Sequence, residues 1–131
     1  DLLPTLLKLA GAPLPQEPID GIDQWDLISG KPGAENRQPY YAFTMVRNLE
    51  AVMSADGRWK LHLEHRYQSI VVPGAAGRPG RAERPTQPRA LYDLRSDPLE
   101  SRNVLEKNPE IAERLSAFAR QHLQRFPALA N

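Results

Sequence analysis

The chain has 131 residues, of which 40% are apolar and 25% are charged, and its formal net charge at pH 7 is +1. These values fit one small globular domain, and the balanced charge provides no global field that would attract nucleic acid or an anionic membrane. Because cysteine is absent, disulfides, thiolate metal sites and thiol nucleophiles are excluded. No apolar run approaches the roughly 20 residues of a membrane span. Together with the balanced charge, this leads us to expect neither a membrane nor a nucleic acid as partner.

The first predicted element is a short helix over residues 2–10. Asp1 is suited to cap it, Pro4 lies in the first turn where a missing N–H is harmless, and Gly11 is suited to end it. Leucines occupy more than one side of this helix, and a helix of this length is marginal alone in water. We expect its apolar surface to be partly uncovered and available for a homo-oligomer. The chain opens without Met and inside a helix pattern, which favours a segment of a longer protein.

Residues 12–39 are rich in proline and glycine and predict an irregular connector. Within it, Trp25, Leu27 and Ile28 predict a single helical turn, with Trp25 as a packing anchor. We therefore divide the chain into residues 1–39, a helix and connector, and residues 40–131, a second subdomain.

The next stretch predicts antiparallel strands. The predicted strands are residues 40–46, 49–54, 58–65 and, with a weaker pattern, 69–72. Asp56 and Gly57 form a strong hairpin signal. In the third strand Trp59, Leu61 and Leu63 alternate with polar residues, which is typical of a half-buried strand.

Residues 73–89 lack an alternating pattern and predict a long exposed loop. A further strand is predicted over residues 90–94, followed by a turn at Asp97 and Pro98. Asn108 is then suited to cap the C-terminal helix, which Pro127 ends. Its apolar stripe contains Ile111, Leu115, Phe118, His122 and Phe126, with Ala112, Ala119 and Leu123 beside it. The predicted fold class is α+β: a small antiparallel sheet of about four strands with the C-terminal helix packed on it.

A search for catalytic patterns finds no G-x-S-x-G elbow, no P-loop and no dinucleotide fingerprint. His62, Glu64 and His65 resemble a compact metal cluster, but in a regular strand His65 would point away from the other two. A solvated surface is therefore the preferred interpretation of these three residues. His122 lies on the helix stripe and is interpreted as a histidine at the core boundary.

Other charged groups also receive structural interpretations. Arg78, Arg81, Arg84 and Arg89 could contact phosphate or sulfate, but a solubilising loop explains them equally well, and no aromatic residue lies among them to stack a base. The carboxylate pairs are Asp20 with Asp23 and Asp93 with Asp97. Since aspartates near turns usually bond to their own backbone, neither pair is assigned as an acid–base couple. No catalytic, cofactor-binding or metal residue is predicted.

Three segments, in order, resemble the C-terminal part of the sulfatase family. Residues 1–9 read D-L-L-P-T-L-L-K-L and are followed by the D-G pair at 20–21 and W-D-L-I-S-G at 25–30, like the family's D-L-x-P-T-L helix, D-G loop and leucine-rich stretch. Residues 51–61 resemble its A-V-R…G-x-W/Y-K-L hairpin. Residues 91–103 resemble L-Y-D-L-x-x-D-P-x-E-x-x-N, which precedes a terminal helix.

This resemblance implies an arylsulfatase-like hydrolase whose N-terminal catalytic domain is the partner of this chain and carries a formylglycine and a divalent ion such as calcium. The formylglycine derives from a C/S-x-P-x-R motif; residues 96–100 here read S-D-P-L-E, so we reject them as a nucleophile site. The segment would brace the catalytic domain and shape the substrate mouth, and we expect it to be inactive alone. A periplasmic or secreted location would suit the parent protein. The alternatives are a free-standing interaction or ligand-binding module and part of a related phosphate or phosphonate ester hydrolase.

Overall fold

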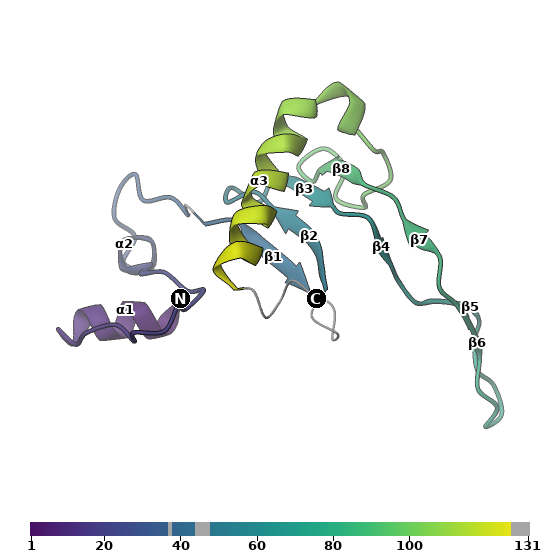
Figure 1. Ribbon diagram of the computed structural model, residues 1–131, viewed down its shortest axis with the longest axis horizontal. Helices are drawn as coiled ribbons and strands as arrows, with labels where there is room; N and C mark the ends of the chain where they lie inside the picture. Colours follow the sequence, from purple (N-terminus) through teal and green to yellow (C-terminus); the bar gives the residue numbers. More distant parts are fainter. Residues whose placement is uncertain (37, 44–47, 127–131) are drawn as a thin grey trace.

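The computed structural model describes residues 1–36, 38–43 and 48–126. Figure 1 shows an N-terminal segment, a body in which a long helix lies on a sheet, and a thin arm that projects from the body. The helices are α1 (Leu2–Leu9), α2 (Trp25–Ile28), the 3-10 turn η1 (Leu105–Lys107) and α3 (Pro109–Arg125). The strands are β1 (Tyr40–Phe43), β2 (Leu49–Met53), β3 (Trp59–His62), β4 (His65–Arg66), β5 (Ser69–Val72), β6 (Arg81–Glu83), β7 (Thr86–Gln87) and β8 (Ala90–Asp93). Positions 44–46 of the first predicted strand, and Pro127, lie outside the described residues.

The body confirms the predicted α+β class. Four strands form an antiparallel sheet in the order β1-β2-β3-β8. The D-G signal is confirmed as a turn in which Gly57 has a φ of 69°, a conformation that favours glycine. The Ser54 hydroxyl accepts the Trp59 N–H and donates to Asp56, which closes this hairpin.

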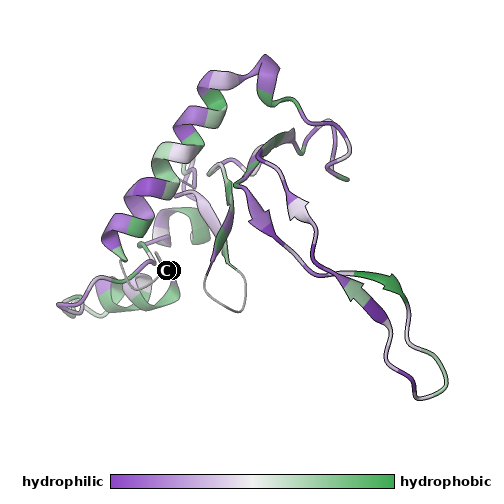
Figure 2. Cartoon of the chain, turned by 45° about the vertical axis from the view of Figure 1, so that its right-hand side comes forward, coloured by the Kyte–Doolittle hydropathy of each residue, from purple (hydrophilic) through white to green (hydrophobic). Residues whose placement is uncertain are grey.

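The core lies between the sheet and α3. Val52, Leu61 and Leu91 are direct cross-strand neighbours and are all buried. Leu115 of α3 is buried against them, as the helical stripe predicts, and Ala112 and Ala119 belong to the same cluster. In Figure 2, α3 correspondingly shows alternating hydrophilic and hydrophobic colour along its length.

The two predicted helix caps are right in position but wrong in partner. Asp1 and Asn108 stand at the N-cap positions of α1 and α3, yet neither side chain bonds to its helix. Asp1 accepts the N–H of Ile22 in the connector, and the Asn108 amide donates to the carbonyl of Val104. Both side chains therefore bond to nearby backbone segments of the same chain rather than to the first turn of their helix.

The prediction of a long loop over residues 73–89 is wrong in part. The segment is exposed, as expected, but β6 pairs with β5 and β7 pairs with β4, so residues 65–87 form a two-stranded arm (Figure 1). At its tip Ala76 and Gly77 both have positive φ between the bridged residues Ala75 and Arg78, the arrangement of a two-residue hairpin turn. The sequence did not reveal this pairing because neither face of the arm is buried, and no alternating pattern results.

The N-terminal segment keeps much of its apolar surface exposed. α1 ends before Gly11, whose φ is 65°, and α2 is the single turn predicted. Trp25 is 41% exposed, so the prediction that it is a packing anchor is wrong within this chain. Arg125 of α3 donates to the carbonyl of Ile19 at 2.7 Å and ties the segment to the body. None of the described helices combines the length and apolarity needed to cross a membrane.

Candidate functional site

The sheet face opposite α3 carries a cluster of charged and aromatic side chains. Lys60 and His62 project from β3 to this face, because they alternate with the buried Leu61. His62 has Ala51 and Ala90 as its cross-strand neighbours, so small side chains flank its ring. The ring of Tyr92, on β8, contacts the His62 ring edge-on, with the two ring centroids 5.7 Å apart.

Glu100 completes this cluster from the turn after β8. Its Oε1 accepts a hydrogen bond from Lys60 Nζ at 2.6 Å, and its Oε2 lies 2.7 Å from His62 Nε2. Burial alone would raise the pKa of Glu100, but the contacts with Lys60 and His62 outweigh it and the net effect lowers that pKa. Glu100 has a φ of 54°, so the turn holds it in a conformation that is uncommon outside glycine.

His65 joins the cluster against the sequence-based expectation. Its ring lies 5.8 Å from that of His62, nearly parallel, because β3 ends at His62 and the strand is interrupted before β4. His65 Nδ1 lies 2.8 Å from the carbonyl oxygen of Leu63, which orients the ring. Glu64 is exposed and takes no part, so the three residues do not form one cluster. The interpretation as solvated surface is wrong for His62 and His65, whose side chains are only 19% and 11% exposed.

The described residues do not include a group of three or more histidine, aspartate or glutamate side chains placed to hold a metal ion. The cluster instead pairs bases with acids: His62 and Lys60 with Glu100, and His65 with Glu50, whose carboxylate lies 3.7 Å away. Sequence reasoning missed the Glu100 contacts, since about 40 positions separate it from Lys60 and His62. The only available signal was its place in the D-P-x-E pattern.

The turn that carries Glu100 is held by hydrogen bonds to the side chains of Asp97 and Asn103, most of them partly buried. One oxygen of Asp97 accepts the backbone N–H and the hydroxyl of Ser101, and the other accepts the N–H of Arg102. These bonds lower the pKa of Asp97, and the bond from the Arg102 N–H has the largest effect. The Asn103 side chain accepts the N–H groups of Leu91 and Leu105, each at 3.0 Å. Asp97 thus bonds to the backbone of its own turn, as expected for an aspartate in this position.

Asp93 has a separate structural partner. Arg58 donates to both of its oxygens, at 2.9–3.2 Å, and this contact lowers the pKa of Asp93. The Ser96 hydroxyl donates to the backbone carbonyl of Asp93 and has no catalytic base as its bonded partner. Asp93 and Asp97 therefore anchor two ends of one turn.

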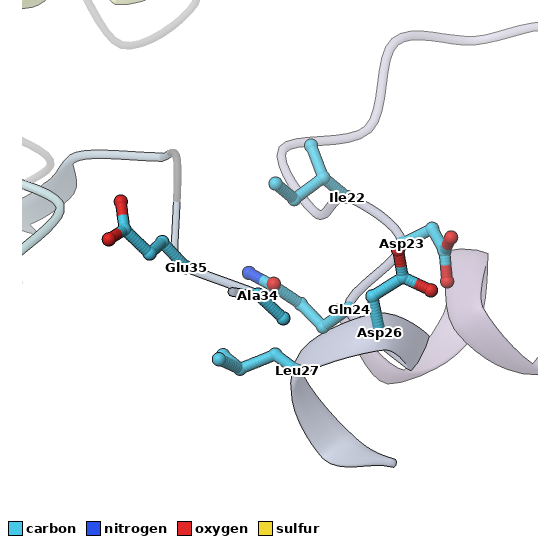
Figure 3. Close-up of a pocket in the computed structure, with 7 residues that line it drawn as sticks. All are labelled: Ile22, Asp23, Gln24, Asp26, Leu27, Ala34 and Glu35. Atoms are coloured by element: carbon cyan, nitrogen blue, oxygen red, sulfur yellow. The ribbon is translucent and has the colours of Figure 1, made fainter. Parts of the chain in front are cut away.

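The other predicted carboxylate pair is also divided. Asp23 accepts from Lys8 and from the N–H of Trp25, whereas Asp20 lines a different hollow beside His122. Asp23 lines a cavity of about 230 Å³ within the connector. Figure 3 shows the residues around this cavity. Its lining residues are Ile22, Asp23, Gln24, Asp26, Leu27, Ala34 and Glu35. Three carboxylates line this cavity, those of Asp23, Asp26 and Glu35. Two of them already have partners, because Asp23 is paired with Lys8 and Asp26 with Lys31.

His122 is a buried histidine of the seam between the connector and α3. Its ring stacks on Tyr41 with centroids 3.9 Å apart, and Phe126 lies 4.9 Å away. Burial lowers the pKa of His122, although Asp20 acts in the opposite direction. The four predicted arginines are also separated: three lie on the arm, whereas Arg89 donates to Ser116 of α3.

Comparisons with known proteins place these features in context. No family model matches the chain. Human arylsulfatase A is 36% identical over 111 residues, which cover 80% of this chain and 21% of that protein. Bovine arylsulfatase A is 35% identical over 119 residues, or 86% of this chain and 23% of that protein.

A solved structure from a study of the metabolism of multiple glycosaminoglycans by Bacteroides thetaiotaomicron has a similar fold. It superposes with a TM-score of 0.60 and 22% identity, covering 92% of this chain and 24% of its own. The chain thus spans less than a quarter of the length of the relatives it matches.

Proposed function

The chain belongs to the sulfatase family, and on this premise we propose that it is the C-terminal region of a sulfuric-ester hydrolase. In this role it braces the catalytic domain and shapes the substrate mouth, and it does not perform the chemistry alone. The observation that carries the proposal is the 36% identity with human arylsulfatase A, which extends over most of this chain but only a fifth of that protein.

The residues that match the family pattern support a bracing role. Asp93, Asp97, Glu100 and Asn103 are each bonded to the sheet or to their own turn, so the turn after β8 is fixed to the sheet. A turn fixed in this way suits a subdomain that positions loops beside a catalytic centre located elsewhere.

An exposed apolar surface offers a place for the catalytic domain to dock. It lies on α1, where the exposed leucines are Leu2, Leu3, Leu6 and Leu9. Exposed apolar patches of this kind commonly mark protein contacts. We propose that this surface is covered in the parent protein.

The formylglycine and divalent ion expected of the parent do not fit the described residues. Cysteine is absent from the whole chain, and residues 96–100 end in Glu where the formylglycine motif requires Arg. In that segment Asp97 and Glu100 are already bonded to the turn and the sheet. We therefore assign both groups to the catalytic domain and derive no step from them here.

The test begins with the parent gene, which should encode a C/S-x-P-x-R motif upstream of residue 1. The parent, a version lacking residues 40–131, and the 131-residue chain should then be assayed on p-nitrophenyl sulfate, p-nitrophenyl phosphate and a sulfated polysaccharide. We expect the intact parent to prefer a sulfate ester, the shortened version to lose activity, and the chain alone to be inactive. A complete gene without the motif, or turnover by the purified chain, would refute the proposal.

A further inference from the structure

The arm, residues 65–87, concentrates positive charge that the rest of the chain does not share. It contains four arginines and one glutamate, for a net charge of +3. The remaining 108 residues contain 13 basic and 15 acidic side chains, for a net charge of −2. The overall charge of +1 is therefore the sum of a basic arm and a slightly acidic remainder of the chain.

The arginines are distributed along the arm from base to tip. Arg66 donates to the carbonyl of Arg84, which places these two residues side by side at the base. Arg81 stands opposite Val72 in the middle, and Arg78 belongs to the bridge at the tip. At about 3.3 Å per strand residue, Arg78, Arg81 and Arg84 extend over roughly 20 Å.

These arginines are available for an external partner. All four are exposed, and Figure 2 shows the arm well separated from the body. Arg81 forms an exposed ion pair with Glu83, at 3.1 Å, which costs little to break. Among the described residues, no acidic side chain forms an ion pair with Arg66, Arg78 or Arg84.

We propose that the arm binds a linear sulfated polysaccharide through Arg78, Arg81 and Arg84, with Arg66 supporting the base of the site. Guanidinium groups pair with sulfate-type oxygens through two parallel hydrogen bonds. A single small ester cannot reach three arginines spread over the arm, whereas a polymer with repeated anionic groups can. This inference rests on the proposed function and assigns the polymer as its substrate class.

Nucleic acid is the competing polyanion, and the arm fits it less well. The part of the arm that carries these three arginines has no aromatic residue on which a base could stack.

The test is binding of the 131-residue chain to immobilised dextran sulfate, with uncharged dextran and a DNA duplex as comparison surfaces. The arm variant is Arg78→Gln/Arg81→Gln/Arg84→Gln. The matched control, Arg102→Gln/Lys107→Gln/Arg114→Gln, removes the same charge from exposed positions around the start of α3. Because the contacts of the arm with the body involve His65 at its base and none of the three substituted arginines, the arm variant should unfold at the same temperature as the wild type.

We expect dextran sulfate binding to weaken about tenfold or more in the arm variant and by less than about twofold in the control. Absence of binding, or equal losses in both variants, would overturn the inference. Equally tight DNA binding that depends on the same arginines would overturn the assignment to a polysaccharide. In the parent, unchanged use of a sulfated polymer by the arm variant would sink the inference alone, whereas lack of sulfatase activity would sink the proposed function.

Discussion

At the scale of single residues, Glu100 shows how one side chain links a turn to the sheet. It is held at a positive φ and its carboxylate contacts both Lys60 and His62. Glycine would suit such a φ better, so the conformation is maintained by the bonds that Asp97 and Asn103 make around it.

The lowered pKa of Glu100 makes a specific pH dependence predictable. A carboxylate whose folded pKa is below the unfolded value, about 4.3, stabilises the fold above that value and loses this effect as pH falls through the folded pKa. Glu100→Gln should therefore reduce the free energy of unfolding by about 1 kcal/mol near neutral pH. The difference from the wild type should shrink towards pH 3. Urea unfolding at several pH values measures it, with the exposed Glu106→Gln as control.

A difference between wild type and Glu100→Gln that stays constant from neutral to acid pH would show that the charge of Glu100 does not matter. Both proteins should also lose stability in acid through Asp93 and Asp97, because the pKa values of these two carboxyls are lowered as well. The contribution of Glu100 is therefore the difference in free energy of unfolding between the two proteins at each pH.

At the scale of elements, the sheet and α3 depend on one shared core. Leu61 lies at the centre of the row formed with Val52 and Leu91 and is fully buried. The packing of α3 is therefore inseparable from the register of β2, β3 and β8.

This arrangement predicts contrasting effects for two leucines. Leu61→Ala should lower the free energy of unfolding by about 2–5 kcal/mol, since it leaves a cavity under α3. Leu99→Ala should change it by less than about 0.5 kcal/mol, because Leu99 is 88% exposed. Chemical denaturation of both variants measures the contrast, and comparable losses would contradict the position of the core.

The element that sequence reasoning described least well is the arm. Prolines and glycines at 73–89 indicated a loop, and the arginines indicated solvation, yet the segment pairs with β4 and β5. An isolated ribbon has no buried face, so its sequence lacks the alternating hydrophobic pattern by which a strand is predicted. A two-stranded ribbon is only marginally stable alone.

At the scale of the whole molecule, we expect α1 to determine whether the isolated chain associates in solution. Leu2 is 70% exposed and Leu6 60%, on a helix that the body leaves largely uncovered. Without a catalytic domain, this surface should associate with a second copy of the chain.

We therefore expect the isolated chain to form dimers, and Leu2→Gln/Leu6→Gln to shift it towards the monomer. Light scattering coupled to size-exclusion chromatography measures the change, and Leu99→Gln is the control for adding polarity to an exposed leucine. In the parent protein the same double variant should weaken the bracing contact and lower thermal stability. A monomeric wild-type chain at high concentration would contradict the expected association.

The sequence by itself determined the hairpin at Gly57, the stripe of α3, the α+β class and the resemblance to sulfatases, because these depend on local patterns or short motifs. Only the tertiary structure decided that Glu100 meets Lys60 and His62, that His65 stacks near His62, and that the arm is paired. Those contacts depend on strand register, on a strand interruption and on residues about 40 positions apart. Such features leave no periodic signal, because they arise from how the elements are placed rather than from which elements form.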